Sequence, residues 1–295
     1  MGGDVLVVGD VMTDIIVRPE GAVVIGSDRR ARIESHPGGS GANQAVWLGA
    51  MGAPVRFVAR VGAADVDRLT ARFAQWGVTA LLRGDATAPS GTLVTLVDPS
   101  GERSFLTDRG ANLNLGPADL PETLLDGARL LLISGYSLFA PGPRAAVLAL
   151  MRAAHSRGVP TAVDPASAGF LQEVGIDAFL EWTRGAGTIF ANADEARALT
   201  GALRRPDQLA ALAEHYGRVV LKLGAAGALM GDRRGIIAAA AAPKVEVVDT
   251  TGAGDAFAAG FITAELGGAN ASAALAAGAA AGAKAVTMVG GQPGR

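Results

Sequence analysis

Short apolar runs alternate with longer segments of helical character between residues 130 and 223. The runs that predict strands are 130–134, 161–164, 188–191 and 219–223, and the segments that predict helices are 144–157, 177–184, 193–200 and 206–216. Uninterrupted apolar strands are typical of a parallel sheet that is buried on both faces, and the helices between them supply the crossover connections. The pattern therefore predicts an α/β fold, a doubly wound, mostly parallel sheet with helices on both faces, to which the apolar run at 4–10 adds a first strand.

The part of the chain before residue 130 mixes this pattern with a second one. Strands of the main sheet are expected at 55–61 and 78–82, and helices that cover it at 42–51 and 65–76. Shorter β-rich runs, separated by Pro and Gly or flanking the turn Asp98-Pro99-Ser100-Gly101, lie at 15–17, 23–25, 31–34, 92–97 and 103–107. A Pro-Ser-Gly turn between β-rich runs is a strong hairpin signal. We expect these five runs to form a small sheet of their own.

The stretch Asp249-Thr250-Thr251-Gly252-Ala253-Gly254-Asp255-Ala256-Phe257 joins a predicted strand at 245–248 to a predicted helix at 256–266. The first amides of such a helix have no intrahelical partner, and together with the helix dipole they form an anion site. Asp255 places a carboxylate beside that site. Phosphoryl transfer to a hydroxyl requires both parts, one to hold charge and one to take the proton. Ordinary turn chemistry with an acid in the first helical turn explains the same residues without catalysis.

Composition excludes several other classes. The 295 residues are 49% hydrophobic with a net charge of −2, so neither nucleic acid nor an anionic membrane is expected as a partner. The apolar run at 5–8 is too short to span a bilayer, and polar residues interrupt 269–286, which we predict to be a packed helix. None of the three lysines follows a glycine, which excludes a Walker A loop. The absence of cysteine fits a reducing compartment, and we expect a cytoplasmic protein.

A second glycine turn, His36-Pro37-Gly38-Gly39-Ser40-Gly41-Ala42-Asn43-Gln44-Ala45, also opens a predicted helix. On its residues alone it is a flexible helix entry. Together with the stretch around Asp255, it resembles the two signatures of the ribokinase-like (PfkB) family of carbohydrate kinases. This resemblance covers essentially the whole chain, 1–295, as a single domain, and it implies that the small sheet is a lid formed by about 12–37 and 88–110.

The resemblance assigns roles to the residues of both signatures. It implies that Asp255 is the base that activates the acceptor hydroxyl. The residues whose amides would hold the transferred phosphoryl group are Gly252, Ala253 and Gly254. It also implies that Gly38 and Gly39 let the sugar lie against the backbone and that Asn43 bonds the sugar hydroxyls.

Two acids and an amide elsewhere in the chain match the family in the same way. Asp14 matches an aspartate that bonds substrate hydroxyls, although a solvated acid on an edge strand is the simpler interpretation. Asn192-Ala193-Asp194-Glu195 resembles the family element in which Asn and Glu order Mg²⁺ and its waters. Asn192 as a helix cap explains that element equally well, and we expect Asp194 to face solvent.

Two glycine-rich or acidic turns complete the resemblance. Lys222, Gly224 and Gly227 resemble the strand end where the family binds its nucleotide, although a lone lysine at a strand end is often only solvated. Asp249 and Thr251 resemble the monovalent-cation loop of ribokinase. The implied cofactors are therefore ATP and Mg²⁺, with K⁺ as a weaker expectation.

The implied activity is ATP-dependent phosphorylation of a primary hydroxyl of a small sugar, in a homodimer that pairs through the lids. Ser40 replaces the lysine that ribokinase-type sequences usually carry, so a ketose, a sugar acid or a nucleoside stays open as the substrate. A nucleoside kinase and a non-catalytic sugar- or nucleotide-binding regulator are the alternatives. Tyr136 and Trp47 are candidates for an apolar wall, although a core position is the simpler interpretation of Trp47. Arg103 and Arg109 lie on or after the lid hairpin. One of them is a candidate to cover the active site, and a surface arginine is the simpler interpretation of each.

Overall fold

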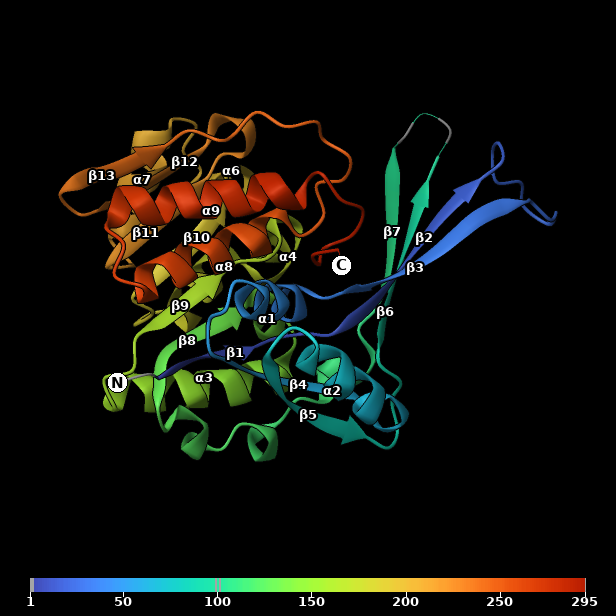
Figure 1. The fold of residues 1–295 in the computed structure, drawn as a ribbon, viewed down its shortest axis with the longest axis horizontal. Coiled ribbons are helices and arrows are strands. Elements are labelled where there is room, and N and C mark those ends of the chain that lie inside the picture. The colour runs from blue at the N-terminus through green and yellow to red at the C-terminus, as the bar shows by residue number, and fades with distance from the viewer. Residues whose placement is uncertain (1–2, 99, 101, 295) are drawn as a thin grey trace.

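The computed structural model describes residues 3–98, 100 and 102–294, and two β-sheets organise it (Figure 1). Within the described residues, the larger sheet has nine strands in the order β13-β12-β11-β10-β9-β8-β1-β4-β5. All neighbours from β11 to β5 in this order pair in parallel, whereas β12 and β13 pair antiparallel at one edge. The strands are β1 Asp4–Val8, β4 Val55–Gly62, β5 Val78–Asp85, β8 Ala128–Ser134, β9 Thr161–Asp164, β10 Thr188–Asn192, β11 Arg218–Lys222, β12 Ala228–Asp232 and β13 Gly235–Ala240.

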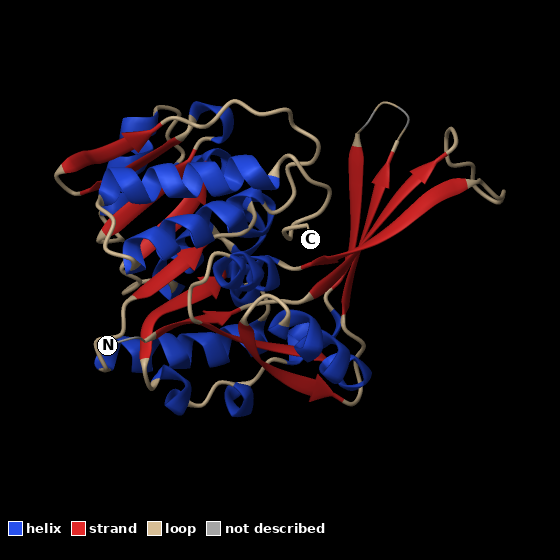
Figure 2. Cartoon of the chain, in the orientation of Figure 1, coloured by secondary structure: helices blue, strands red, loops and turns tan. Residues whose placement is uncertain are grey.

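Helices cover both faces of this sheet (Figure 2). Successive side chains of β1 enter opposite cores, Val5 and Val7 on one face and Leu6 and Val8 on the other. The first face is covered by α1 Ser40–Ala50, α2 Val66–Ala74, α8 Ala253–Leu266 and α9 Ala271–Ala285. The second face is covered by α3 Pro141–Ser156, α4 Ala168–Val174, α5 Ile176–Trp182, α6 Ala193–Thr200 and α7 Arg205–Ala213. The predicted fold class is confirmed, and burial on both faces explains why these strands are apolar throughout.

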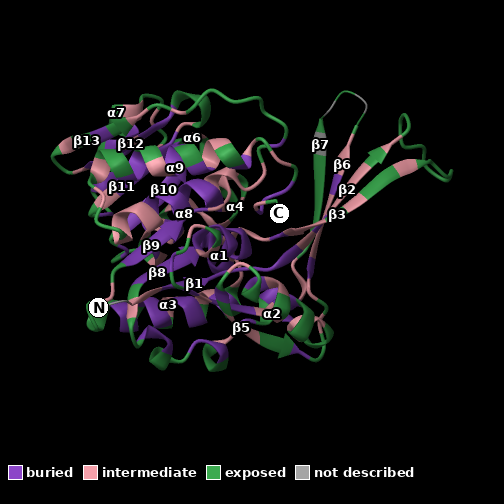
Figure 3. Cartoon of the chain, in the orientation of Figure 1, coloured by how far each residue is buried: buried purple, intermediate pink, exposed green. Residues whose placement is uncertain are grey.

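The smaller sheet stands away from the main body and is far more exposed (Figure 3). Its strands, in the order β3-β2-β6-β7, are β3 Ala31–Gly38, β2 Met12–Pro19, β6 Gly91–Val97 and β7 Arg103–Asp108. The central pair, β2 and β6, is parallel and the two outer pairs are antiparallel. This sheet confirms the predicted small sheet, and we call it the lid.

Two predicted strands are wrong. Residues 23–25 form a loop in which Ile25 is fully exposed, because the chain there leaves the lid between β2 and β3. Residues 245–248 have no strand partner, and Val247 is 60% exposed, because the antiparallel hairpin β12–β13 already occupies the edge of the sheet. The sequence pattern missed that hairpin and also α4.

The alanine-rich segment folds as α9, which packs against α8 in the core of one face, as predicted. Small side chains allow this close approach, since a Cβ on Gly260 of α8 would lie 2.8 Å from the Ala277 carbonyl oxygen. In the described part of the chain, no helix has both the length and the apolar character that a membrane crossing requires.

Candidate active site

Two cavities meet at the amino end of α8. The lid-side cavity, of about 520 Å³, lies between the lid and the carboxyl ends of the central strands. The α9-side cavity, of about 610 Å³, lies between β11, the segment 242–247 and α9. Both are lined by Asn192, Lys222, Thr250 and Gly254, so the two cavities adjoin at these residues. Carboxyl ends of parallel strands are where doubly wound sheets bind ligands.

The amino end of α8 is built from the glycine turn. Gly252 precedes the helix with φ +73°, and a Cβ there would lie 2.5 Å from the backbone of Gly291, so glycine is required. The following amides of Ala253 and Gly254 belong to the first helical turn, where intrahelical acceptors are missing. The Ala253 amide donates instead to the Thr250 carbonyl oxygen at 3.3 Å. Both cavities reach Gly254, and these amides therefore present partial positive charge to the junction.

Asp255, in the first turn of α8, lines the lid-side cavity and is buried, with 9% of its surface exposed. Three side chains of α1 donate hydrogen bonds to its carboxylate: Ser40 Oγ at 2.7 Å, Asn43 Nδ2 at 3.0 Å and Gln44 Nε2 at 3.2 Å. Burial and the nearby Asp164 raise its pKa to about 7, although the bonds from Ser40 and Asn43 oppose this shift. A carboxylate with a pKa near neutrality suits a general base. The contacts of Ser40 and Gln44 were not foreseen, because no local pattern links α1 to a helix more than two hundred residues later.

Asp14 also lines the lid-side cavity, on β2 beside the glycine turn. A Cβ on Gly38 would lie 2.2 Å from its carboxylate, and Gly39 has φ +93° as it enters α1. Its Oδ1 is buried without a hydrogen-bond partner in the described structure. Burial, together with the charges of Asp10 and Asp249, raises the pKa of Asp14 to about 7. The interpretation as a solvated edge acid is wrong, and an unpaired carboxylate in a cavity is suited to accept bonds from a polyol.

Asn192 and Glu195 form a capping box at the start of α6. The Asn192 side chain accepts from the amides of Asp194 and Glu195, both at 2.9 Å, and Glu195 accepts from Asn192 N at 2.8 Å and Nδ2 at 2.6 Å. Glu195 is buried, which raises its pKa to about 7, and Asp194 faces solvent as predicted. The described residues contain no cluster of three metal-ligating acids or histidines. The single buried carboxylate of Glu195 fits a Mg²⁺ ion that is held otherwise by water and phosphate oxygens.

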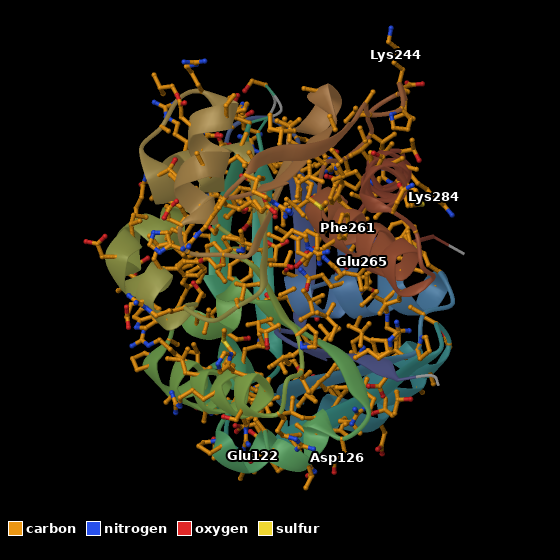
Figure 4. All side chains as sticks on the ribbon, turned by 90° about the vertical axis from the view of Figure 1, so that its left-hand side faces the viewer. Glu122, Asp126, Lys244, Phe261, Glu265 and Lys284 are labelled. Atoms are coloured by element: carbon orange, nitrogen blue, oxygen red, sulfur yellow. The ribbon has the colours of Figure 1, made fainter. Side chains whose placement is uncertain are left out.

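The α9-side cavity is lined mainly by small and aliphatic side chains. Ala279, Gly282 and Ala283 of α9 form one wall, and Gly224 lies at the turn after β11. Lys244 also lines it and extends outward from the molecule (Figure 4). Apart from Lys222 and Lys244, this cavity offers backbone and small side chains rather than charged groups. Gly227, at φ +89°, has a further structural role, because a Cβ would lie 2.0 Å from the Ala240 carbonyl oxygen.

Asp249 and Thr251 form a compact loop before α8. Asp249 is buried, and its carboxylate accepts from Thr251 N at 3.0 Å, Thr251 Oγ1 at 2.8 Å and Gly290 N at 3.0 Å. These bonds connect the loop to the segment that follows α9. The cation role of this loop stays a prediction.

Arg109 contradicts its interpretation as a surface residue. Its side chain is only 17% exposed, lies 3.5 Å from Asp10 Oδ2 and stacks 4.7 Å from the ring centre of Tyr136. Tyr136 lines the lid-side cavity as predicted, together with Phe170 of the unforeseen α4. Trp47 instead packs in the core at 2% exposure, the simpler of its two interpretations. The side chain of Arg103 lies outside the described part of the chain.

A doubly wound sheet with a projecting lid, and a helix amino end between two cavities, defines the class of ribokinase-fold kinases. The chain belongs to the pfkB family of carbohydrate kinases, since the family model "pfkB family carbohydrate kinase" matches residues 3–294. This finding confirms the predicted family and enzyme class, a sugar or nucleoside kinase.

Individual relatives agree with this assignment. The chain is 30% identical to a fructokinase of Klebsiella pneumoniae over 271 residues, 89% of this chain and 84% of that protein. The adenosine kinase of Sinorhizobium meliloti has the same fold, with a TM-score of 0.88, 25% identity and coverage of 99% and 96% of the two chains. A putative ribokinase II of E. coli, solved in complex with ATP and Mg²⁺, has a TM-score of 0.86 at 24% identity, covering 98% and 94%.

Proposed function

We propose that this kinase transfers the terminal phosphate of ATP to a primary hydroxyl of a small sugar or sugar derivative, with Asp255 as the general base. The observation that carries this proposal is the position of Asp255. Its buried carboxylate belongs to the first turn of α8, the helix whose amino end lies where the two cavities adjoin. One cavity supplies room for an acceptor and the other for a donor.

The chemistry follows from the residues at the junction. Asp14, Gly39 and Asn43 hold the sugar by its hydroxyls, so that one hydroxyl lies beside Asp255. Asp255 takes the hydroxyl proton as the oxygen forms its bond to the terminal phosphorus and the bond from phosphorus to the bridging oxygen breaks, leaving ADP. The amides of Gly252, Ala253 and Gly254 stabilise the charge that spreads over the equatorial oxygens.

The proposed donor site is the α9-side cavity. Lys222, Gly224 and Gly227 would bind the phosphates and let them pass close to the backbone, and Asn192 and Glu195 would order Mg²⁺, which neutralises phosphate charge. The complex of a fold relative with ATP and Mg²⁺ supports this assignment. For K⁺, the fixed carboxylate of Asp249 beside Thr251 is the supporting feature, and activity in KCl against NaCl at equal ionic strength is the test.

A substrate panel tests the function directly. Sugars, sugar acids and nucleosides are screened by thermal shift with a non-hydrolysable ATP analogue, and compounds that raise the melting temperature are then assayed for ADP release. We expect at least one acceptor to give ADP and a phosphorylated product. Binding of acceptor and nucleotide without any transfer would favour the non-catalytic regulator instead.

A nucleoside is the second candidate acceptor, and an aromatic wall favours it. The ring of Phe170 stacks on Phe139 at 5.2 Å and meets the edge of Tyr136 at 5.9 Å, and both Tyr136 and Phe170 line the lid-side cavity. Aromatic rings offer a planar base a larger stacking contact than a free sugar makes. Purine or pseudouridine nucleosides should then raise the melting temperature while free sugars do not, and Phe170→Ala should abolish that difference.

We also propose a homodimer that pairs through the outer face of the lid. By strand register, this face carries six aliphatic residues: Ile15, Val17, Ile33, Val94, Leu96 and Leu106. Ile33 and Leu106 are 64% and 61% exposed, which a second copy of the chain would cover. Light scattering should give twice the monomer mass, and Leu106→Asp should reduce it to the monomer. Location in the cytoplasm stays a prediction that cell fractionation tests.

A further inference from the structure

Asp164, at the carboxyl end of β9, lines the lid-side cavity without a role in the proposed transfer so far. Its side chain is buried, with 3% exposed. One carboxylate oxygen accepts from Lys222 Nζ at 2.7 Å, and the other accepts from the amide of Ala166 at 3.0 Å. A single carboxylate therefore connects β9, β11 and the turn that follows β9.

The partner lysine lies beside the amides at the start of α8. Lys222 lines both cavities, and its Nζ would be 3.1 Å from a Cβ built on Gly254. Burial acts to lower the pKa of Lys222, but Asp164 and Glu195 outweigh it and the pKa is raised, so the side chain keeps its positive charge. A buried ammonium without a counter-ion tends to lose its proton instead.

The second bond of Asp164 acts on the wall of the lid-side cavity. Ala166, with φ +70°, is the one non-glycine residue in the left-handed region among the residues described. Such a backbone is held only where its surroundings determine it, and the bond from its amide to Asp164 is a direct restraint. Ala166 and the neighbouring Ser167 and Phe170 line the cavity.

We propose that Asp164 is a positioning residue for phosphoryl transfer, which holds the Lys222 ammonium at the amino end of α8, where the transferred phosphoryl group lies. The inference rests on the proposed kinase function. It differs from a purely structural ion pair in one respect, because the effect of Asp164 on kcat then depends on Lys222.

Three variants test this: Asp164→Asn, Lys222→Met and the double variant, with Asp194→Asn as a control that removes a nearby solvent-facing acid. Calorimetry compares binding of a non-hydrolysable ATP analogue with binding of AMP. Lys222→Met should weaken binding of the analogue about 10- to 100-fold, because a charged hydrogen bond is lost. Its affinity for AMP should stay within about threefold of wild type. Asp164→Asn should bind the analogue within about threefold of wild type, because it removes a negative charge near the phosphates, while kcat falls about tenfold or more.

Retained analogue affinity beside a lowered kcat is the readout that a structural role would not give, and the pH profile adds a second one. The charged and titratable groups that face Asp255 are Asp164 from β9, Lys222 from β11 and Tyr136 after β8. Because the charge of Asp164 raises the pKa of Asp255, Asp164→Asn should shift the midpoint of the kcat/KM profile to lower pH. The Asp194→Asn control should keep analogue affinity and kcat within about twofold of wild type and leave the pH midpoint unshifted.

The outcomes separate cleanly. A double variant no slower than Lys222→Met supports the proposal, since coupled residues are not additive. A wild-type kcat and midpoint in Asp164→Asn, a loss of analogue binding in that variant, or additive losses in the double variant overturn it. An inactive wild type would instead refute the proposed kinase function, which is a different result.

Discussion

The two cavities at the amino end of α8 have similar volumes and opposite character. The lid-side cavity is lined by the carboxylates of Asp10, Asp14 and Asp255 and by Arg109, whereas small and aliphatic side chains such as those of Ala279 and Ala283 dominate the α9-side cavity. Groups that form directed bonds and move protons therefore gather on one side. On the other side, shape and bare backbone provide the binding surface.

This difference has a physical reason. A proton transfer needs titratable groups whose pKa values are tuned by burial and by neighbouring charge, as in Asp14 and Asp255. A planar base and a phosphate chain need close approach instead, which alanine and glycine allow. Substitutions on the lid side should therefore change kcat and pH dependence, and substitutions on the α9 side should change nucleotide affinity.

The largest expected effect is that of Asp255→Asn on the lid side. The amide keeps the shape of the side chain but cannot accept the hydroxyl proton, so kcat should fall about 10²- to 10⁴-fold. ADP release under saturating substrates measures kcat, and thermal melting shows that the variant is folded. A turnover within tenfold of wild type at an unchanged melting temperature would exclude Asp255 as the base.

Asp14→Asn should lower kcat/KM for the acceptor about 10- to 100-fold and also change stability with pH. The fold raises the pKa of Asp14 from 3.8 to about 7. The stability that protonated Asp14 contributes to the folded state is therefore complete below about pH 4 and is lost as pH rises through 7. The variant should therefore gain melting temperature over wild type at pH 8 and little at pH 5. Equal differences at both pH values would contradict the burial of an unpaired carboxylate.

On the α9 side, Ala283→Phe should raise KM for ATP about tenfold or more and leave kcat and the acceptor KM within about threefold, because the ring fills the cavity without touching the lid side. Ala280→Phe is the matched control, since Ala280 is exposed on the same helix and does not line the cavity. Steady-state kinetics with each substrate varied in turn distinguish the two. A change in the acceptor KM alone would break the proposed division between the cavities.

The smallest expected effect is that of Ser40→Ala, which removes the 2.7 Å bond to Asp255. That bond lowers the pKa of Asp255, so its loss should move the kcat/KM midpoint from near 7 to higher pH. Activity should fall about three- to tenfold at pH 6.5 and recover at pH 8.5. The pH–rate profile is the measurement, and a loss that is equal at both pH values would show that Ser40 acts on something other than the protonation of Asp255.

The strand and helix pattern predicted the main sheet well. Runs such as 130–134 and 161–164 are apolar throughout because the sheet buries both of their faces. The errors fall where neighbours decide the structure. The run at 245–248 has strand composition but no partner, since β13 closes the edge, and the alanine-rich β13 itself has weak strand composition but pairs with β12.

The sequence by itself determined the class of the fold, the two glycine turns and the position of Asp255 at a helix amino end, because these depend on local residue order and backbone freedom. Only the tertiary structure decided that Ser40 and Gln44 bond to Asp255, that Arg109 stacks on Tyr136, and that Asp164 pairs with Lys222. Those contacts join elements distant in the chain, and the pKa values of the buried acids depend on the same long-range packing.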